Sequence, residues 1–344
     1  MEAIERQTAC QTRLPIIYGS LEGLQASKRV IDPRTLKYDL VSDYSTLSEY
    51  SWVVGMDLIS GEEVLVPAHI AGYMWFDVPG RQITSLGSSN GLASGNVREE
   101  AICQALCELI ERDAWTLADL GAHLLPIARR RAVAPRGVYN GPDDTEMFPS
   151  LEEMDDHASE SFRAVGLQPV LHDITSDIGI PTVIAVVSDE SVPSMPMLHA
   201  GAGTHPDARV AVKRALTEVA QSRCVDIQSV REDLALADWT RDQSGLQAKR
   251  VSHINHECWF LSKSRQQRPL NELPSAISDD VSDDLAYLLG RLVANEITEV
   301  IVIDFTPQNE FFSVVRVIVP DLEQASVQRG PVGRRALQFW RSHV

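Results

Sequence analysis

The 344-residue chain lacks the positive charge that broad nucleic-acid binding requires. It has 31 Lys and Arg against 48 Asp and Glu, which gives a net charge of −17 at pH 7. Because nucleic-acid phosphates need a basic footprint, this charge excludes a general nucleic-acid binder, and it argues against an anionic membrane surface. A phosphate ligand held through a metal ion stays open, since Mg²⁺ takes carboxylate ligands.

Long apolar runs and a targeting segment are also missing. No stretch approaches the roughly 20 apolar residues of a membrane helix, and residues 1–5 have neither the basic nor the apolar region of a signal peptide. We therefore expect a cytoplasmic protein. The five cysteines are sparse; Cys103 and Cys107 lie four apart, but without a second close pair the pattern favours small buried thiols over a zinc site.

The apolar pattern predicts an α+β fold in which helices are layered on mostly antiparallel sheets. Strand pairs are predicted at 53–57 with 63–66 (a hairpin), at 168–174 with 182–187, and at 299–305 with 312–319. Helices are predicted at 97–116, 151–165, 207–226 and 281–296. Residues 1–6 resemble the middle of a helix without an N-cap, which suggests that an earlier segment is missing.

The predicted helix 97–116 carries the strongest functional signal. Asn96 and Glu99 form a capping-box pattern at its start. A rotation of about 100° per residue gathers four side chains opposite the apolar stripe: Glu100, Gln104, Glu108 and Glu111. Such a face is usually solvated, but Glu108 and Glu111 repel each other at i,i+3, and the helix has no lysine to relieve them. A cation between these carboxylates would explain the pattern.

The same spacing occurs twice more in the chain. Glu2 and Glu5 are followed by Arg6, just as Glu108 and Glu111 are followed by Arg112. The predicted helix 207–226, with Asp207 as its N-cap, contains Arg214, Glu218, Gln221 and Arg223. Carboxylates from two helices would bind a divalent metal, and the arginines would meet phosphate. P-loop, H-E-x-x-H and E-x-x-H patterns are absent from the sequence.

Two long segments resemble the signatures of YcaO proteins. The first is S-S-N-G-L-A-S-G-N at 88–96, which continues to residue 114, and the second joins G-A-G-T-H at 201–205 to residues 214–223. The resemblance covers residues 1–330 and leaves 331–344 as a C-terminal tail. Residues 173–181 and 317–323 resemble the branch of the family that works beside TfuA-type partners.

The resemblance implies an enzyme that uses ATP and Mg²⁺ to phosphorylate a backbone amide oxygen of a peptide. Phosphorylation makes that oxygen a good leaving group, and the enzyme mainly positions groups and neutralises charge. Sulfide would then give a thioamide, which is the usual product of the TfuA-associated branch. Three alternatives stay open: an azoline-forming cyclodehydratase of ribosomal peptide natural products, a truncated non-catalytic scaffold, and an accessory factor for ribosomal-protein methylthiolation. The implied partners are a peptide or protein substrate, a TfuA-like protein and a second copy of the chain.

The resemblance also implies roles for individual residues. The metal ligands would be Glu2, Glu5, Glu108 and Glu111. The nucleotide site would include Asn96, Glu100, Glu108, Glu111, Arg112 and Arg223, and the catalytic residues would be Arg112, Arg223, Glu218 and Gln221. His205 would lie near the nucleotide or act as a packed or capping residue, and Ser88 and Ser89 would contact phosphate or form a turn. The family's segment before the first glutamate pair is absent, and so is the proline-rich tail of many azoline-forming members, which favours the thioamide.

Overall fold

The computed structural model describes residues 2–38, 40–75, 78–84, 88–132, 150–151, 157–189, 197–233, 267–308, 310–324 and 331–341. The chain forms two compact units. The first comprises Met1–Leu120, Ser176–Gly179 and Ala276–Val344, and the second comprises Gly121–Thr175 and Ile180–Ser275. Cys258 lies outside the described residues, and so does most of the acidic stretch at 143–160. The predicted boundary at residue 330 stays a prediction.

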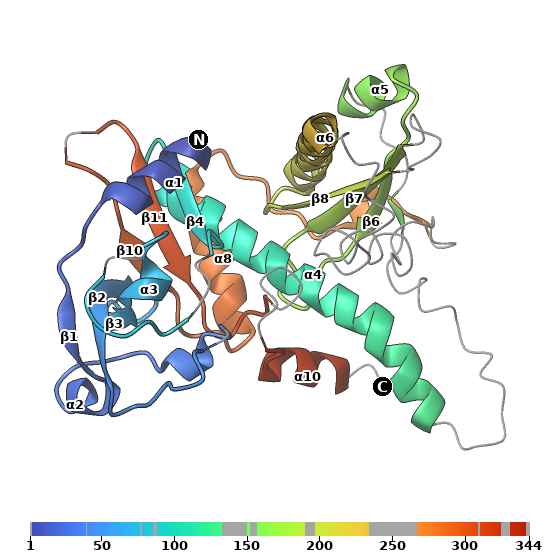
Figure 1. The fold of residues 1–344 in the computed structure, drawn as a ribbon. Coiled ribbons are helices and arrows are strands. Elements are labelled where there is room, and N and C mark those ends of the chain that lie inside the picture. Colours follow the sequence, from blue (N-terminus) through green and yellow to red (C-terminus); the bar gives the residue numbers. More distant parts are fainter. Residues whose placement is uncertain are drawn as a thin grey trace. The chain divides into compact units, whose positions relative to one another are not determined.

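The first unit is built on a six-stranded antiparallel sheet (Figure 1). Its order is β1 (Ile17–Ser20), β2 (Glu49–Asp57), β10 (Ile301–Asp304), β11 (Ser313–Ile318) and β4 (Leu92–Gly95), with β3 (Glu63–Pro67) paired to β2. The β2–β3 hairpin and the β10–β11 pair are antiparallel, as the sequence predicts. β4 pairs only with β11 among the described strands, so it forms an edge beside which a site can open.

Helices cover both faces of this sheet. The first unit contains α1 (Glu2–Gln11), α2 (Leu21–Gln25), α3 (Ala68–Ala71), the start of α4 (Arg98–Ala132), α8 (Val281–Ala294), α10 (Arg334–Arg341) and a short 3₁₀ helix (Pro33–Thr35). Val314 and Ile318 of β11 share a buried core with Ala9 of α1. Because side chains alternate along a strand, Val315 and Val317 face the opposite side, where Figure 1 shows α4 and α8.

The second unit is a five-stranded sheet covered by α6 (Ala208–Asp233). Its order is β8 (Met197–Thr204), β7 (Thr182–Asp189), β6 (Val170–Asp173), β5 (Ser150–Leu151) and β9 (Gln267–Arg268), and only the β5–β9 pair is parallel. The unit also contains α5 (His157–Ala164) and a short 3₁₀ helix (Leu270–Glu272). Asp207 is the N-cap of α6, as predicted, because its Oδ1 accepts a hydrogen bond from the Arg209 N–H at 2.9 Å.

The α+β class with mostly antiparallel sheets is therefore confirmed. The helix predictions are right in place, and the prediction of 281–296 is nearly right in length, since α8 spans Val281–Ala294. α4 continues to Ala132, well beyond the predicted end at 116, while α5 begins at His157 and ends at Ala164. Within the described residues no helix is both long and apolar enough to span a membrane.

Candidate functional site

The site in the first unit begins with the loop at 88–91, which leads into β4. The Asn90 N–H donates to Ser88 Oγ at 3.0 Å, and the Gly91 carbonyl accepts from the Val317 N–H at 2.8 Å. Gly91 has a φ of 75°, and a Cβ at this position would lie 2.3 Å from the Val317 oxygen, so only glycine fits. The Gly91 N–H donates to Glu108 Oε2 at 3.0 Å. The loop thus ties Glu108 of α4 to the edge of the sheet.

Glu5 of α1 shares this edge with Glu108. Ser94 Oγ of β4 donates to Glu5 Oε2 at 3.3 Å. Burial and, next, the charge of Glu108 raise the pKa of Glu5 to about 7. Each of these half-buried carboxyl groups opposes the ionisation of the other, and a bound cation would relieve that repulsion.

Arg112 lies beside both carboxylates of the second predicted pair. Its Nη2 is 3.4 Å from Glu111 Oε1 and 3.7 Å from Glu108 Oε1, and its guanidinium lies 6.0 Å from the centre of the Trp115 ring. Glu111 is only 3 % exposed, so this face of α4 is not a solvated one. A buried carboxylate beside an arginine can hold that arginine in place for a phosphate.

The four predicted metal ligands are not gathered into a ready site. Glu2 is exposed on α1, where its Oε1 pairs with Arg6 Nη2 at 2.5 Å. Across the described ranges, no three His, Cys, Asp or Glu side chains lie close enough together to hold a metal ion. Mg²⁺ usually takes one or two carboxylates and completes its shell with water and substrate phosphates. The metal roles of these four glutamates stay a prediction.

Asn96 and Glu100 contact each other directly at the start of α4. Glu100 Oε2 accepts from the Asn96 backbone N–H at 2.8 Å and from its Nδ2 at 2.9 Å. The capping-box prediction is corrected here, because α4 begins at Arg98 and the carboxylate that reaches back is that of Glu100, not that of Glu99. The pair lies at the surface of the first unit, and its role in nucleotide binding stays a prediction.

The remaining predicted residues belong to the second unit. Glu218 Oε2 accepts from the Ala202 N–H at 2.7 Å, which repeats the contact between Glu108 and Gly91. Arg223 Nε pairs with Asp189 Oδ2 at 2.7 Å, and Gln221 is exposed. The Asp207 N–H donates to His205 Nδ1 at 3.0 Å, a bond that the capping alternative for His205 predicts. Their catalytic or nucleotide roles stay predictions.

Several contact residues were not singled out by sequence reasoning. Gly91 and Ser94 lie inside the first motif, so their backbone and hydroxyl contacts were within reach of prediction. Arg316 stands alone in the apolar run V-V-R-V-I of β11, and a lone cation in a buried strand is a signal that could have been used. Asp189 at the end of β7 pairs with Arg223, and nothing in the sequence around Asp189 indicates this ion pair.

Comparison with known proteins gives the family. Residues 1–323 match the family model described as YcaO cyclodehydratase, ATP- and Mg²⁺-binding. An uncharacterized protein of Methanothermobacter thermautotrophicus is 36 % identical over 305 residues, which cover 89 % of this chain and 73 % of that protein. An uncharacterized protein in the tfuA 3′ region of Rhizobium leguminosarum bv. trifolii is 30 % identical over 344 residues, covering 98 % of this chain and 76 % of its own length.

Solved structures agree on the fold. A heterocyclase in complex with substrate and cofactor has a TM-score of 0.70 at 22 % identity, and the match covers 94 % of this chain and 42 % of that chain. The YcaO protein of Methanopyrus kandleri, bound with AMPPCP and Mg²⁺, has a TM-score of 0.64 at 24 % identity over 97 % of this chain and 78 % of its own. This chain thus spans less than half the length of the heterocyclase that it resembles.

The residues at the edge of β4 fit the two cofactors of this family. Carboxylate oxygens of Glu5 and Glu108 are hard ligands of the kind that Mg²⁺ prefers. Burial and, next, the charge of Glu108 raise the pKa of Glu5, and a bound cation would oppose both effects. Arg112 is a cation beside Glu108, and its role at the phosphates stays a prediction. On the match over residues 1–323, supported by these contacts, the chain belongs to the YcaO family of ATP- and Mg²⁺-binding proteins.

Proposed function

We propose that this protein activates a peptide backbone amide with ATP and that sulfide then converts the amide into a thioamide. The amide oxygen attacks the γ-phosphorus, and ADP leaves. Sulfide adds to the amide carbon and loses its proton, the carbon–oxygen bond breaks, and phosphate departs with that oxygen. The observation that carries the proposal is the Glu5–Glu108 pair beside Arg112 in a chain of an ATP- and Mg²⁺-binding family.

In this proposal the chain's own residues position the substrates and neutralise the charge on the phosphates. Glu5, Glu108 and Glu111, with Glu2 at the exposed end of the set, would hold Mg²⁺, which would neutralise charge on the phosphates. Arg112 stabilises the charge that develops on the transferred phosphoryl group. Asn96 and Glu100 line the nucleotide. The other proposed catalytic residues are carried by the second unit: Glu218, Gln221 and Arg223.

Sulfide is proposed as the nucleophile because of one relative. The Rhizobium protein in the tfuA 3′ region is 30 % identical over nearly the whole chain. The description of the family as cyclodehydratases favours a second candidate, in which a Cys, Ser or Thr side chain of the substrate attacks and an azoline forms. The two reactions change the peptide mass in opposite directions, since sulfur for oxygen adds mass and loss of water removes it.

The first test is calorimetric titration of the full chain with ATP, with and without Mg²⁺. We expect binding that requires Mg²⁺ and that Glu111→Gln weakens, because the variant removes one of the proposed carboxylate ligands of the ion. Glu99→Gln is the matched control, a glutamate in the first turn of the same helix and outside the proposed metal set. Equal ATP affinity of Glu111→Gln and the wild type would refute the metal role, and no binding by the wild type would favour a non-catalytic scaffold.

The second test follows the product. The chain is incubated with candidate peptides, ATP and Mg²⁺ in two parallel reactions, one with sulfide and one without. The mass of each peptide is then measured by mass spectrometry. A mass gain that needs sulfide supports thioamide formation. A mass loss that occurs without sulfide supports the cyclodehydratase, and in that case the sulfide proposal is wrong.

A further inference from the structure

Arg316 is a buried arginine in an apolar strand of the first unit. It is 0 % exposed and stands between valines on β11, the strand that pairs with β4. A fully buried guanidinium is costly to desolvate unless it makes good hydrogen bonds. Its position therefore calls for a role that an aliphatic side chain could not fill.

Both terminal nitrogens of Arg316 hold the loop at 88–91. Nη1 donates to the Asn90 carbonyl at 2.9 Å, and Nη2 donates to the Ser88 carbonyl at 2.7 Å. Because the two carbonyls are two residues apart, one planar guanidinium fixes the path of the backbone between them. The next residue, Gly91, donates its N–H to Glu108.

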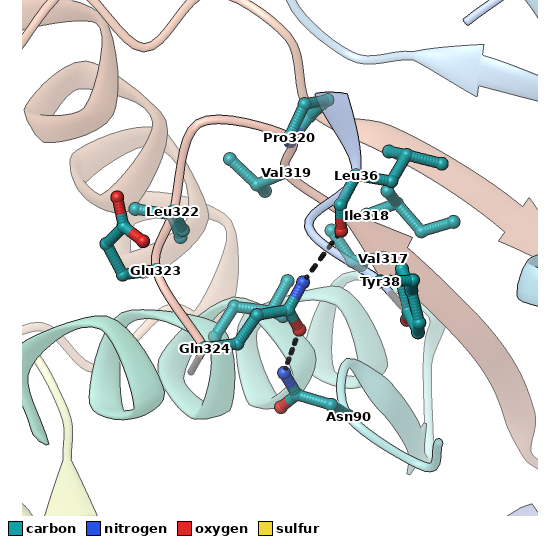
Figure 2. A pocket seen from close by; sticks show the side chains of 11 residues that line it. Leu36, Tyr38, Asn90, Val317, Ile318, Val319, Pro320, Leu322, Glu323 and Gln324 are labelled. Carbon is teal, nitrogen blue, oxygen red and sulfur yellow. Dashed lines mark hydrogen bonds between the residues drawn. The ribbon is translucent and has the colours of Figure 1, made fainter. Parts of the chain in front are cut away.

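The far side of the loop is held as well. Figure 2 shows Asn90 beside a small pocket, where its Nδ2 donates to Gln324 Oε1 at 2.7 Å and Gln324 Nε2 donates to the Leu36 carbonyl at 3.2 Å. These contacts tie Asn90 of the loop to Gln324 and, through it, to Leu36.

We propose that Arg316 is a positioning residue for the metal site: it fixes the 88–91 loop so that the Gly91 N–H holds Glu108 in place for Mg²⁺. This inference rests on the proposed function, because it assumes that Glu108 binds the ion. Arg316 itself touches neither nucleotide nor metal in this role. It acts through two carbonyls and one backbone N–H.

A purely electrostatic role predicts a different result. The charge of Arg316 is attracted by Glu108 and Glu5. If that charge were its contribution, a substitution that keeps the charge would leave Mg²⁺·ATP binding unchanged. If Arg316 positions the loop, removing it weakens Mg²⁺ binding although a nearby positive charge is gone.

The variants Arg316→Lys and Arg316→Met separate these roles. Lysine keeps the charge but cannot reproduce the planar fork that spans two carbonyls. Positioning predicts that both variants bind Mg²⁺·ATP roughly tenfold or more weakly, as when a hydrogen bond to a charged group is lost. A purely electrostatic role predicts wild-type affinity for Arg316→Lys, because lysine keeps the positive charge, and that result would overturn the proposal.

Controls separate the inference from loss of stability and from failure of the proposed function. Arg29→Met removes ion pairs to the buried Asp57 and to Glu299, so it should destabilise the same unit while keeping Mg²⁺-dependent binding. Hydrogen exchange of the Gly91 amide needs no ligand and should accelerate in Arg316→Lys. If the wild type does not bind ATP, the proposed function fails on its own; if Gly91 exchange is unchanged in Arg316→Lys, the positioning role is refuted.

Discussion

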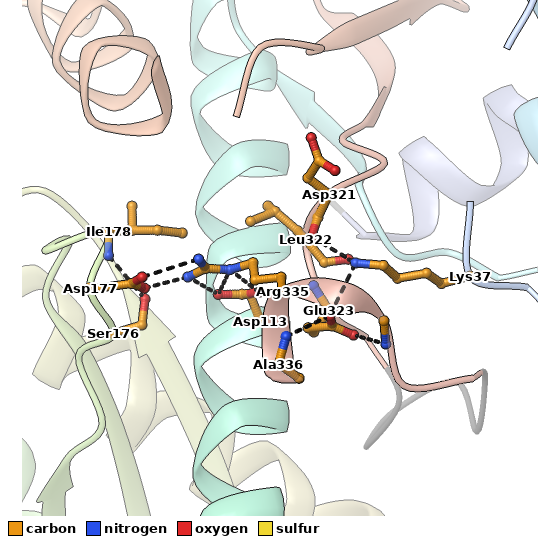
Figure 3. Close-up of polar contacts among 11 residues, drawn as sticks. Lys37, Asp113, Ser176, Asp177, Ile178, Asp321, Leu322, Glu323, Arg335 and Ala336 are labelled. Atoms are coloured by element: carbon orange, nitrogen blue, oxygen red, sulfur yellow. Dashed lines mark hydrogen bonds and ion pairs between the residues drawn. The ribbon is translucent and has the colours of Figure 1, made fainter. Parts of the chain in front are cut away.

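The ion pair between Asp113 and Arg335 attaches α10 to α4 (Figure 3). Arg335 Nε lies 2.8 Å from Asp113 Oδ1, and its Nη2 lies 2.9 Å from Oδ2, so the contact is bidentate. The same Nη2 lies 2.5 Å from Asp177 Oδ1. Asp113 is 0 % exposed and also accepts from the Glu323 N–H at 2.9 Å. Its charge therefore has little contact with water.

We predict that Arg335→Gln lowers the free energy of unfolding of the first unit by about 3–5 kcal/mol, because removing one partner of a buried pair leaves the other charge uncompensated. The double variant Asp113→Asn/Arg335→Gln should be more stable than Arg335→Gln alone. It has no buried charge to compensate at this position, and the introduced amide would still offer an oxygen to the Glu323 N–H.

Urea unfolding of the wild type, both singles and the double variant gives the coupling energy. Arg334→Gln is the matched control, since its side chain is exposed on the same helix, and we expect a change within about 0.5 kcal/mol. Burial raises the pKa of Asp113, and Arg335 opposes that rise. Without Arg335 the folded state binds a proton more readily, so the loss of stability should shrink as the pH falls. A double variant no more stable than Arg335→Gln would refute this reasoning.

Two further predictions concern Glu5 and Gly203. The pKa of Glu5 rises from 4.5 to about 7 on folding, so its contribution to stability is fully present below pH 4.5 and is lost as the pH rises through about 7. In thermal unfolding without Mg²⁺, the melting temperature should therefore fall more between pH 5 and pH 8 in the wild type than in Glu5→Gln. A Cβ on Gly203 would lie 2.1 Å from the Ala211 oxygen of α6, so Gly203→Ala should destabilise the second unit by about 1–3 kcal/mol in urea unfolding. The control is Gly290→Ala in α8, where an added Cβ would meet no atom within 4 Å, and this variant should not destabilise the chain.

The acidic helices could be predicted because their signals are local. The spacing of Glu108, Glu111 and Arg112 on one helix needs only helical periodicity, and Asp207 as N-cap needs only its place before an apolar pattern. Burial could not be predicted in the same way. Glu111 has the sequence of a solvated face, yet it is 3 % exposed because of tertiary packing around α4.

Long-range partners were beyond the sequence for a second reason. Arg316 meets Ser88 and Asn90 across more than two hundred residues, and Arg335 meets Asp113 across a similar separation. No periodicity links such positions, and each bond depends on which strands pair. β11 had to be placed beside β4 before Arg316 could be connected with the loop.

The segments at 173–181 and 317–323 gain a structural reason from the same contacts. Asp177 binds Arg335, and the carboxylate of Glu323 accepts from the Gly333 N–H at 2.8 Å and the Ala336 N–H at 3.0 Å, beside the start of α10. Lys37 adds a contact to Glu323 at 3.3 Å. Asp177 and Glu323 hold α10, and neither needs sulfide chemistry to explain its presence. Asp177 and Glu323 therefore have a structural role at α10, and the direction of the product's mass change distinguishes the two nucleophiles.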